Sequence, residues 1–195
     1  SFSSPSIMWA RGFDNNEGIE TGGVLTGTLS GDYVLACNTQ KDDSAFTDAW
    51  VVKISPDGKM LWNKTIGQAF SDNVTHVMVD SKDNIIVAGY TYLTANSSSC
   101  MGWMFKLGSD GKKIWNKNLG KIRFNACAID KSDHVFLGGY KEKDTLGGQY
   151  SVTAFSADGR RLNEKVYTGR GQVNDIRVTS EGNIFLCGSN WLMLM

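Results

Sequence analysis

Short apolar runs separated by polar turns fill almost the whole chain, and one pattern returns at a fixed spacing. The clearest copy, residues 48–67, reads DAWVVKISPDGKMLWNKTIG, which predicts a strand, a tight Asp-Gly turn and a second strand. It returns at 101–120 as MGWMFKLGSDGKKIWNKNLG and, in weaker form, at 149–169. Because no segment carries a sustained apolar stripe of helical period, we expect almost no helix.

Tryptophans mark the repeat. Trp9, Trp62 and Trp115 are 53 residues apart, and so are Trp50 and Trp103. A period near 50 residues that contains only strand patterns is typical of propeller blades. We therefore predict an all-β fold, a β-propeller with four four-stranded antiparallel blades in this chain.

The repeat also sets the expected boundaries. Residues 1–6 are expected to form a flexible N-terminal tail and residues 7–195 the propeller domain, with blades at about 7–55, 60–107, 113–156 and 161–195. Each blade is predicted to hold four strands, A to D in chain order. The connections from B to C and from D to A are tight, whereas those from A to B and from C to D are longer. All long connections then lie on one side of the molecule, which we call the long-loop face, and binding residues usually lie on such loops.

Composition narrows the function classes. The 195 residues include 20 Lys and Arg and 20 Asp and Glu, so the chain lacks the net basic charge of a general nucleic-acid binder. No apolar run approaches the ~20 residues needed to span a bilayer, so no membrane insertion is expected. Its four cysteines lack the spacing of metal ligands, and we predict neither a metal nor a cofactor. Cys37, Cys127 and Cys187 fall within predicted strands and are expected to be buried.

The run DAWVVKISPDGK followed by NVTHVMVDSKDNIIVAGYTY resembles the SBBP-type β-propeller repeats of bacterial exported and surface proteins. It is more distantly similar to the pyrroloquinoline-quinone-type propellers. The resemblance covers nearly the whole chain after Ser6, although Asn163 stands in the fourth copy where the others have tryptophan. It implies a propeller with a binding or scaffold role in an extracytoplasmic location, and it does not imply one activity.

The number of copies leaves three interpretations open. Such propellers commonly have about six to eight blades, and only four copies are present here. The four blades could close into a ring, two chains could complete one larger ring by self-association, or the chain could be part of a longer polypeptide. An unclosed ring would leave an apolar sheet face on its first and last blades.

Strand A carries a cation at one register in every copy: Arg11, Lys64, Lys117 and Lys165. If strand A lines the axis of the propeller, these cations would converge and could bind an anion. The alternative is that each pairs with a nearby carboxylate or carbonyl group.

The aromatic and histidine residues have simpler interpretations. The tryptophans of strand A could form a stacking platform for a sugar or a quinone, but their repetition at one register favours packing between blades. His76 and His134 have no matched acid or nucleophile in the sequence, so both are expected to be structural.

We predict a non-enzymatic binding or scaffold module that uses the long-loop face for a protein or glycan partner. Aromatic and charged loop residues are typical of interface hot spots. The candidates are Asn15, Asn16, Asp42, Asp43, Phe46, Phe70, Tyr92, Arg123, Phe124, Asp144 and Arg170. The alternative is a glycan-active hydrolase or lyase whose loop carboxylates lie on the same face, for which only the pairs Asp14 with Glu17 and Asp42 with Asp43 are close in sequence.

Overall fold

A computed structural model describes residues 9–14, 18–41, 44–68, 70–95, 99–141, 149–168, 172–188 and 191–195. Within these ranges every regular element is a β-strand, as the apolar pattern predicts. The strands are β1 (Gly18–Gly27), β2 (Tyr33–Lys41), β3 (Thr47–Ile54), β4 (Met60–Ile66), β5 (Asp72–Val79), β6 (Ile85–Tyr92), β7 (Cys100–Leu107), β8 (Lys113–Asn118), β9 (Arg123–Ile129), β10 (Val135–Lys141), β11 (Gln149–Phe155), β12 (Arg161–Thr168), β13 (Asp175–Val178), β14 (Ile184–Cys187) and β15 (Leu192–Leu194). No described segment forms a helix that could cross a membrane.

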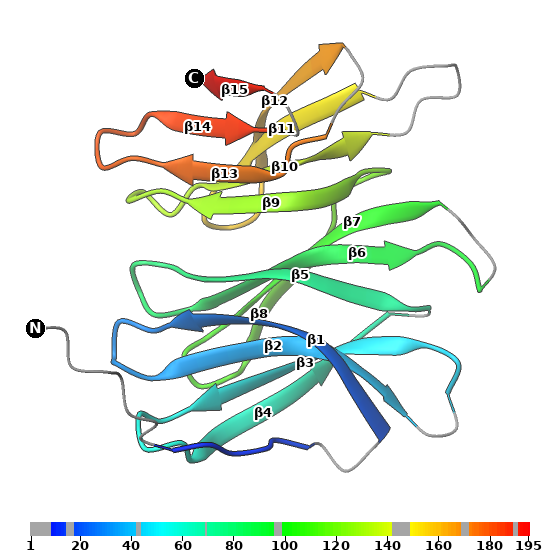
Figure 1. Cartoon of the computed structure of the whole chain (residues 1–195), viewed down its shortest axis with the longest axis vertical. Helices are drawn as coiled ribbons and strands as arrows, with labels where there is room; N and C mark the ends of the chain where they lie inside the picture. Colours follow the sequence, from blue (N-terminus) through cyan, green and yellow to red (C-terminus); the bar gives the residue numbers. More distant parts are fainter. Residues whose placement is uncertain are drawn as a thin grey trace, which may run out of the picture.

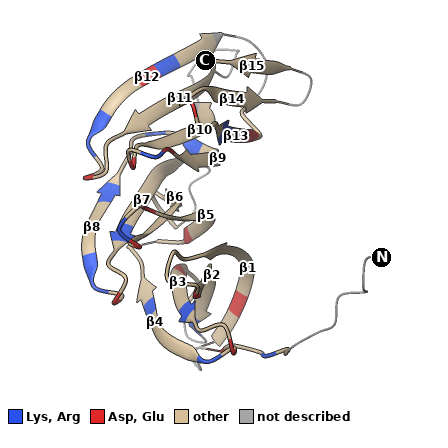
Figure 2. Cartoon of the chain, turned by 90° about the vertical axis from the view of Figure 1, so that its left-hand side faces the viewer, with Lys and Arg blue, Asp and Glu red and all other residues tan. Residues whose placement is uncertain are grey.

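The strands form four antiparallel sheets, each built from neighbours in sequence. The first sheet has the order β1-β2-β3-β4, the second β5-β6-β7-β8, the third β9-β10-β11-β12 and the fourth β13-β14-β15. The sheets follow one another along the longest axis of the molecule (Figure 1). Seen from the side they follow an arc, with β4, β8 and β12 on its convex edge (Figure 2). The chain therefore has the blade arrangement that the repeat predicts.

The grouping of strands differs from the prediction by one strand. Residues 60–66, expected to open the second blade, instead form β4, the last strand of the first sheet. In the same way β8 and β12 end the second and third sheets. The cause is the Asp-Gly hairpin, which joins the strands on either side of it into one sheet. Because a sequence repeat has the same period wherever it is taken to start, the period could not reveal this grouping.

The Asp-Gly turns have the predicted geometry. Gly58, Gly111 and Gly159 have φ angles of 79°, 78° and 74°, a region that favours glycine. In each turn the glycine N–H donates to the carbonyl group three residues earlier, for example from Gly58 to Ser55 O at 2.9 Å. The predicted tight turns are thus confirmed.

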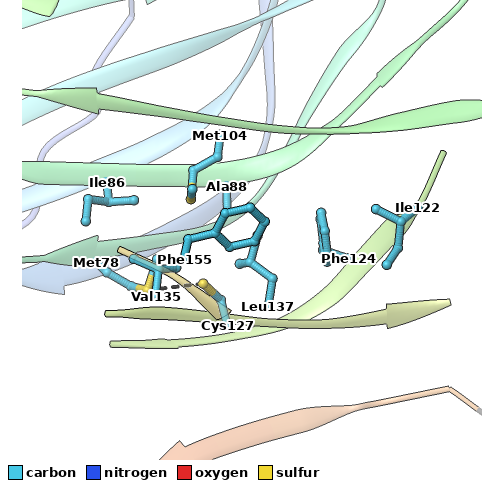
Figure 3. Packing of buried hydrophobic residues seen from close by; sticks show 10 residues of the cluster. All are labelled: Met78, Ile86, Ala88, Met104, Ile122, Phe124, Cys127, Val135, Leu137 and Phe155. Carbon is cyan, nitrogen blue, oxygen red and sulfur yellow. Dashed lines mark hydrogen bonds between the residues drawn. The ribbon is translucent and has the colours of Figure 1, made fainter. Parts of the chain in front are cut away.

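Apolar side chains fill the spaces between successive sheets. Figure 3 shows the cluster between the second and third sheets, where Met104 and Ile86 face Phe155 and Leu137. A second cluster lies between the first two sheets, and a smaller one joins the third and fourth. Cys37 and Cys127 are buried, as predicted, whereas Cys187 is only partly buried.

The tryptophans of the outer strands pack between sheets. Trp62 of β4 donates its indole Nε1 to Ser109 O in the second sheet at 3.1 Å. A Cβ atom at Gly111 would lie 3.0 Å from the Trp62 ring, and one at Gly159 would lie 3.3 Å from Trp115. Trp62 and Trp115 therefore both pack against the glycine of the next Asp-Gly turn, although the buried Nε1 of Trp115 has no hydrogen-bond partner. This shared position favours packing over the stacking platform.

The described sheets do not close into a ring. The first sheet and the fourth lie at opposite ends of the stack (Figure 1), and the arc is open on its concave side (Figure 2). The interpretation of a self-closed four-bladed ring is therefore wrong for the described residues. Residues 1–6, expected to be a tail, lie outside the described ranges.

Candidate functional site

The expected cation channel does not form, because the strands that carry the cations do not line an axis. Lys64, Lys117 and Lys165 lie on β4, β8 and β12, the outermost strands of their sheets (Figure 2). Arg11 lies in the segment 9–14, which belongs to no sheet in the described part. The assumption that strand A is innermost was wrong, since the innermost strands are β1, β5, β9 and β13, each of which contacts the next.

A small pocket lies at the long-loop face, where the second and third sheets meet. It is formed by the end of β6, the start of β7, the residues that lead into β9 and the end of β10. Its lining residues are Tyr90, Tyr92, Cys100, Lys121, Ile122, Arg123 and Tyr140, around a volume of about 170 Å³. Among the described residues, the lining contains three phenol rings and two cations, and no carboxylate.

Arg123 is held over the ring of Tyr90, another lining residue of this pocket. Its guanidinium carbon lies 4.7 Å from the centre of the Tyr90 ring, and its Nη2 donates to the Tyr90 hydroxyl at 3.2 Å. Tyr92 meets Tyr90 edge to face, with ring centres 5.8 Å apart. A cation stacked on one ring and bonded to its hydroxyl is restricted in orientation, which leaves its other donors aimed in fixed directions.

The burial of Tyr90 affects its chemistry. Burial raises the pKa of Tyr90, and the positive charge of Arg123 opposes this effect. The hydroxyl therefore stays protonated at neutral pH and acts as a hydrogen-bonding group, not as a base.

Charge and size together indicate what the pocket can hold. Lys121 and Arg123 are exposed and supply positive charge, while the tyrosine rings supply flat apolar surface. This combination suits an anion on a ring or a short apolar stem. Typical small-molecule sites measure about 300–1,000 Å³, so this pocket fits one chemical group and not a whole ligand.

Only some of the predicted binding residues lie at the pocket. Tyr92 and Arg123 do line the pocket. Phe124 does not belong to the surface, because it is 1% exposed and packs in the core between the second and third sheets. Phe70 packs edge to face on Phe46, with ring centres 5.5 Å apart.

Several predicted surface residues lie outside the described residues. These are Asn15, Asn16, Asp42, Asp43, Asp144 and Arg170. The same holds for Glu17, so neither carboxylate pair that was close in sequence has two described members.

Sequence reasoning missed Tyr90, Tyr140 and Lys121. A signal was present, since a Gly-Tyr dipeptide ends the same strand in two copies, Gly89-Tyr90 and Gly139-Tyr140. Their convergence was not visible, because one tyrosine belongs to the second sheet and the other to the third.

A second polar feature on this face is Asp72, at the start of β5. Its side chain is fully buried, Oδ2 accepts a hydrogen bond from Gln68 N at 2.6 Å, and Oδ1 has no hydrogen-bond partner. Burial raises the pKa of Asp72 to about 6, and the nearby carboxylate of Asp48 adds to this shift. Sequence reasoning missed this pair of carboxylates, because Asp48 and Asp72 are 24 residues apart in the chain.

The histidines do not form a catalytic or metal cluster among the described residues. His134 Nδ1 lies 3.0 Å from Asp130 Oδ2, a local contact next to a turn. His76 on the inner strand β5 has a buried Nδ1 without a hydrogen-bond partner. Burial lowers the pKa of His76, an effect that Asp175 opposes and Arg177 reinforces. No group of three potential metal ligands occurs in the described ranges.

Comparisons with known proteins find only distant structural likeness. No family model matches the sequence, and no curated protein matches it. Among solved structures, the chain is similar to the polysaccharide lyase Uly1, with 11% identity over 90% of this chain and 49% of the other, and a TM-score of 0.48. It is also similar to a mutant apocarotenoid oxygenase of Synechocystis, with 10% identity over 91% of this chain and 46% of the other, and a TM-score of 0.49. The chain thus spans about half the length of these structures, and likenesses this distant do not bear on its function.

Proposed function

We propose that the chain is a binding module of propeller type whose long-loop face holds an acidic protein or glycan partner. The pocket of Tyr90, Tyr92, Tyr140, Lys121 and Arg123 would take one carboxylate-bearing group of that partner. The observation that carries the proposal is the stacking of Arg123 on Tyr90 inside a pocket whose described lining residues include two cations and no carboxylate. The finer family assignment, an SBBP-type repeat protein in an extracytoplasmic compartment, belongs to the same proposal.

The chemistry of the pocket supports recognition more than catalysis. A fixed guanidinium binds a carboxylate through two parallel hydrogen bonds, and the tyrosine rings cover the adjoining apolar atoms. In the part of the lining that the structure describes, no residue is a carboxylate or a histidine, the usual general acids and bases. The pocket is also too small for several sugar units, so the rest of a partner would contact the surrounding loops.

The test measures the binding of D-glucuronate and of a glutamate-rich peptide by titration calorimetry. D-glucose serves as the uncharged control probe. The charged probes are expected to bind and D-glucose is not. Arg123→Met should weaken binding of the charged probes at least ten-fold, since about 1.5–3 kcal/mol is typical of a hydrogen bond to a charged group. The affinity of Arg123→Lys for the charged probes should lie between those of the native chain and Arg123→Met, because lysine keeps the charge and lacks the planar guanidinium.

Lys112→Met is the matched control, because this exposed lysine lies in a turn on the opposite face, paired with Asp110. It should leave binding unchanged. Equal binding by the native chain and Arg123→Met, with both folded by circular dichroism, would rule out the pocket as the site.

The glycan-active alternative has one observation in its favour, the raised pKa of Asp72 near Asp48. A carboxyl group of this kind suits a general acid. However, Asp72 is 0% exposed, so a glycosidic oxygen has no access to it in this structure. Release of reducing or unsaturated sugar ends from acidic polysaccharides, lost in Asp72→Asn, would favour the enzyme over the binding module.

A further inference from the structure

The third sheet departs from the repeat on the face that it turns toward the second sheet. On β7 of the second sheet, Trp103 and Phe105 are buried neighbours with ring centres 4.8 Å apart. The positions 48 residues later, on β11, hold Ser151 and Thr153, which are only 0% and 3% exposed. Phe155, two residues further along β11, packs in the cluster between the second and third sheets (Figure 3). Two buried aromatic rings are thus replaced by two buried hydroxyl groups at this junction.

The residue beside these positions on the outer strand changes as well. In the first sheet Trp50 Nε1 donates to Asn63 Oδ1, and in the second sheet Trp103 Nε1 donates to Asn116 Oδ1. Strand pairing places Glu164 of β12 at the position of these two asparagines. A carboxylate therefore stands beside two hydroxyl groups where the other sheets have a neutral pair of indole and amide.

The replaced groups are only partly satisfied by one another. Glu164, whose side chain is 13% exposed, forms an ion pair with Arg161 of the same strand. Ser151 lies two residues before Thr153 on the same side of β11, and its buried Oγ has no hydrogen-bond partner among the described residues. A buried hydroxyl group of this kind costs free energy unless another group bonds to it, which favours a polar occupant nearby.

A hollow of about 80 Å³ lies at this place. Its lining residues are Leu119, Gly120, Lys121, Ile122, Thr153, Arg161 and Glu164. Thr153 and Ile122 are buried, whereas Lys121, Gly120 and Arg161 are exposed. The hollow therefore combines a buried part with a rim that solvent and a ligand can reach.

The hollow adjoins the pocket that contains Arg123 and Tyr90. Lys121 and Ile122 line both spaces, so no other residue separates them at this point. A partner whose charged group is held by Arg123 can therefore continue past Lys121 to Arg161 and Glu164. One extended ligand fills both spaces.

The side chains of the hollow suit hydroxyl groups. Glu164 only accepts hydrogen bonds when ionised, whereas Lys121 and Arg161 only donate them. A hydroxyl group donates and accepts at once, so it can bond to the carboxylate and to a cation together. Because the charge of Glu164 offsets that of Arg161, a second carboxylate of the ligand would gain little here.

An extended peptide fits this hollow less well than a sugar. Proteins commonly bind extended peptides along a free strand edge, where backbone groups are unpaired. The hollow instead lies over the face of a sheet, where Thr153 and Glu164 are paired neighbours on β11 and β12. Its bonding groups are therefore side chains, which suit the hydroxyl groups of a sugar.

We propose that the hollow binds hydroxyl groups of a neutral sugar unit next to a uronate, so that the partner of the long-loop face is an acidic glycan and not an acidic protein. The inference rests on the proposed function, in which the pocket with Arg123 holds the carboxylate. The junction of the second and third sheets is then a site for at least two successive sugar units.

The first experiment compares two ligands that both carry a uronate. Methyl β-D-glucuronide has no second sugar, whereas a tetrasaccharide of alternating D-glucuronate and N-acetyl-D-glucosamine has neutral sugars beside its uronates. Titration calorimetry on the native chain should give the tetrasaccharide an affinity per uronate at least about five-fold higher, as one or two added hydrogen bonds allow. A glutamate-rich peptide is expected to bind less tightly than the tetrasaccharide.

The second experiment uses two cations of the same strand. Arg161 lines the hollow, whereas Lys165, four residues later and also exposed, lines a different space between the third and fourth sheets. Arg161→Met should remove the advantage of the tetrasaccharide and leave the affinity for methyl glucuronide within about two-fold. Lys165→Met should leave both affinities unchanged. Thr153→Val, which removes a hydroxyl group of the hollow at similar size, gives a second test if Arg161→Met folds poorly by circular dichroism.

The outcomes separate this inference from the proposed function. Equal affinities per uronate for the two ligands, equal losses in Arg161→Met and Lys165→Met, or tighter binding of the glutamate-rich peptide would each overturn the glycan inference. The proposed function would still stand in these cases, provided that Arg123→Met weakens binding of the charged ligands. If the native chain bound none of the charged ligands, the proposed function would be wrong and the inference with it.

Discussion

Single side chains set the chemistry of the long-loop face. Among them, Asp72 has a pKa that its surroundings raise to about 6. It is fully buried with an unpartnered Oδ1, and its neighbour Asp48 carries like charge. The corresponding positions between the second and third sheets hold Met101 and Ile122, which have no charge to bury. The carboxyl pair is therefore a local property of one sheet junction and not part of the repeat.

Asp72 should make stability depend on pH. Its pKa is raised from 3.8 to about 6, so the folded state favours the protonated carboxyl group. The stabilisation is complete below the unfolded pKa and is lost as pH rises through about 6. Relative to the native chain, Asp72→Asn should therefore gain up to about 3 kcal/mol in the free energy of unfolding between pH 4 and pH 7.

Urea unfolding at several pH values measures this difference. Asp110→Asn is the control, because Asp110 is exposed and hydrogen bonds from Lys112 hold its pKa below the ordinary value. Its difference from the native chain should be flat above pH 5. A flat difference for Asp72→Asn as well would contradict the prediction.

At the scale of the element, glycines on the second strand of a sheet do two different things. Gly138 lets the next sheet approach, since a Cβ atom there would lie 2.6 Å from Val173. Gly139 instead lets the inner strand of its own sheet bulge, because a Cβ atom there would lie 2.2 Å from Arg123 O. The Gly-Gly dipeptide does not distinguish the two roles in the sequence, because the bulge depends on strand pairing.

Gly139→Ala is accordingly expected to destabilise the fold. The added methyl group meets backbone and not a flexible side chain, so the strands must separate, at a cost of about 1–3 kcal/mol. Gly27→Ala is the matched change, because nothing lies within 4 Å of a Cβ atom at Gly27. It should change the free energy of unfolding by about 0.5 kcal/mol or less. Denaturant unfolding measures the free energy of unfolding of both variants. If Gly139→Ala were as stable as Gly27→Ala, the proposed role of Gly139 in the bulge would be refuted.

The whole molecule is a row of sheets, each stabilised mainly by its neighbours. Its four sheets differ in how much they bury. Among the described residues, the cluster between the third and fourth sheets has five buried members, Ala126, Val152, Val173, Ile176 and Leu186, whereas the cluster between the second and third has ten. The fourth sheet also has the shortest strands, of four, four and three residues. Stability in such a row depends on the contacts between adjacent units, so the ends open first.

We expect the amides of β13 to β15 to exchange hydrogen faster than those of β5 to β7 in dilute protein. Hydrogen exchange read by mass spectrometry measures the rate for each strand. Uniform exchange across all four sheets, or slowest exchange in β13 to β15, would contradict this order of opening.

The candidate site could be predicted only in part. Tyr92 and Arg123 were found because loop aromatics and cations are typical of binding surfaces. Phe124 was misplaced on that surface, since its sequence neighbours do not reveal that it packs between two sheets. The pocket itself combines residues from β6, β7, β9 and β10, and no spacing in the sequence brings these together.

The sequence by itself determined the strands, the tight turns and the repeat, because alternation, β-branched residues and Asp-Gly dipeptides act over a few neighbouring positions. Only the tertiary structure decided which strand ends each sheet, that the described sheets form an open arc, and that Lys64, Lys117 and Lys165 lie on its outer edge. These features depend on contacts between residues some 50 positions apart, and a repeat looks the same from every starting point. The burial of Asp72 and the stacking of Arg123 on Tyr90 follow from the same long-range packing.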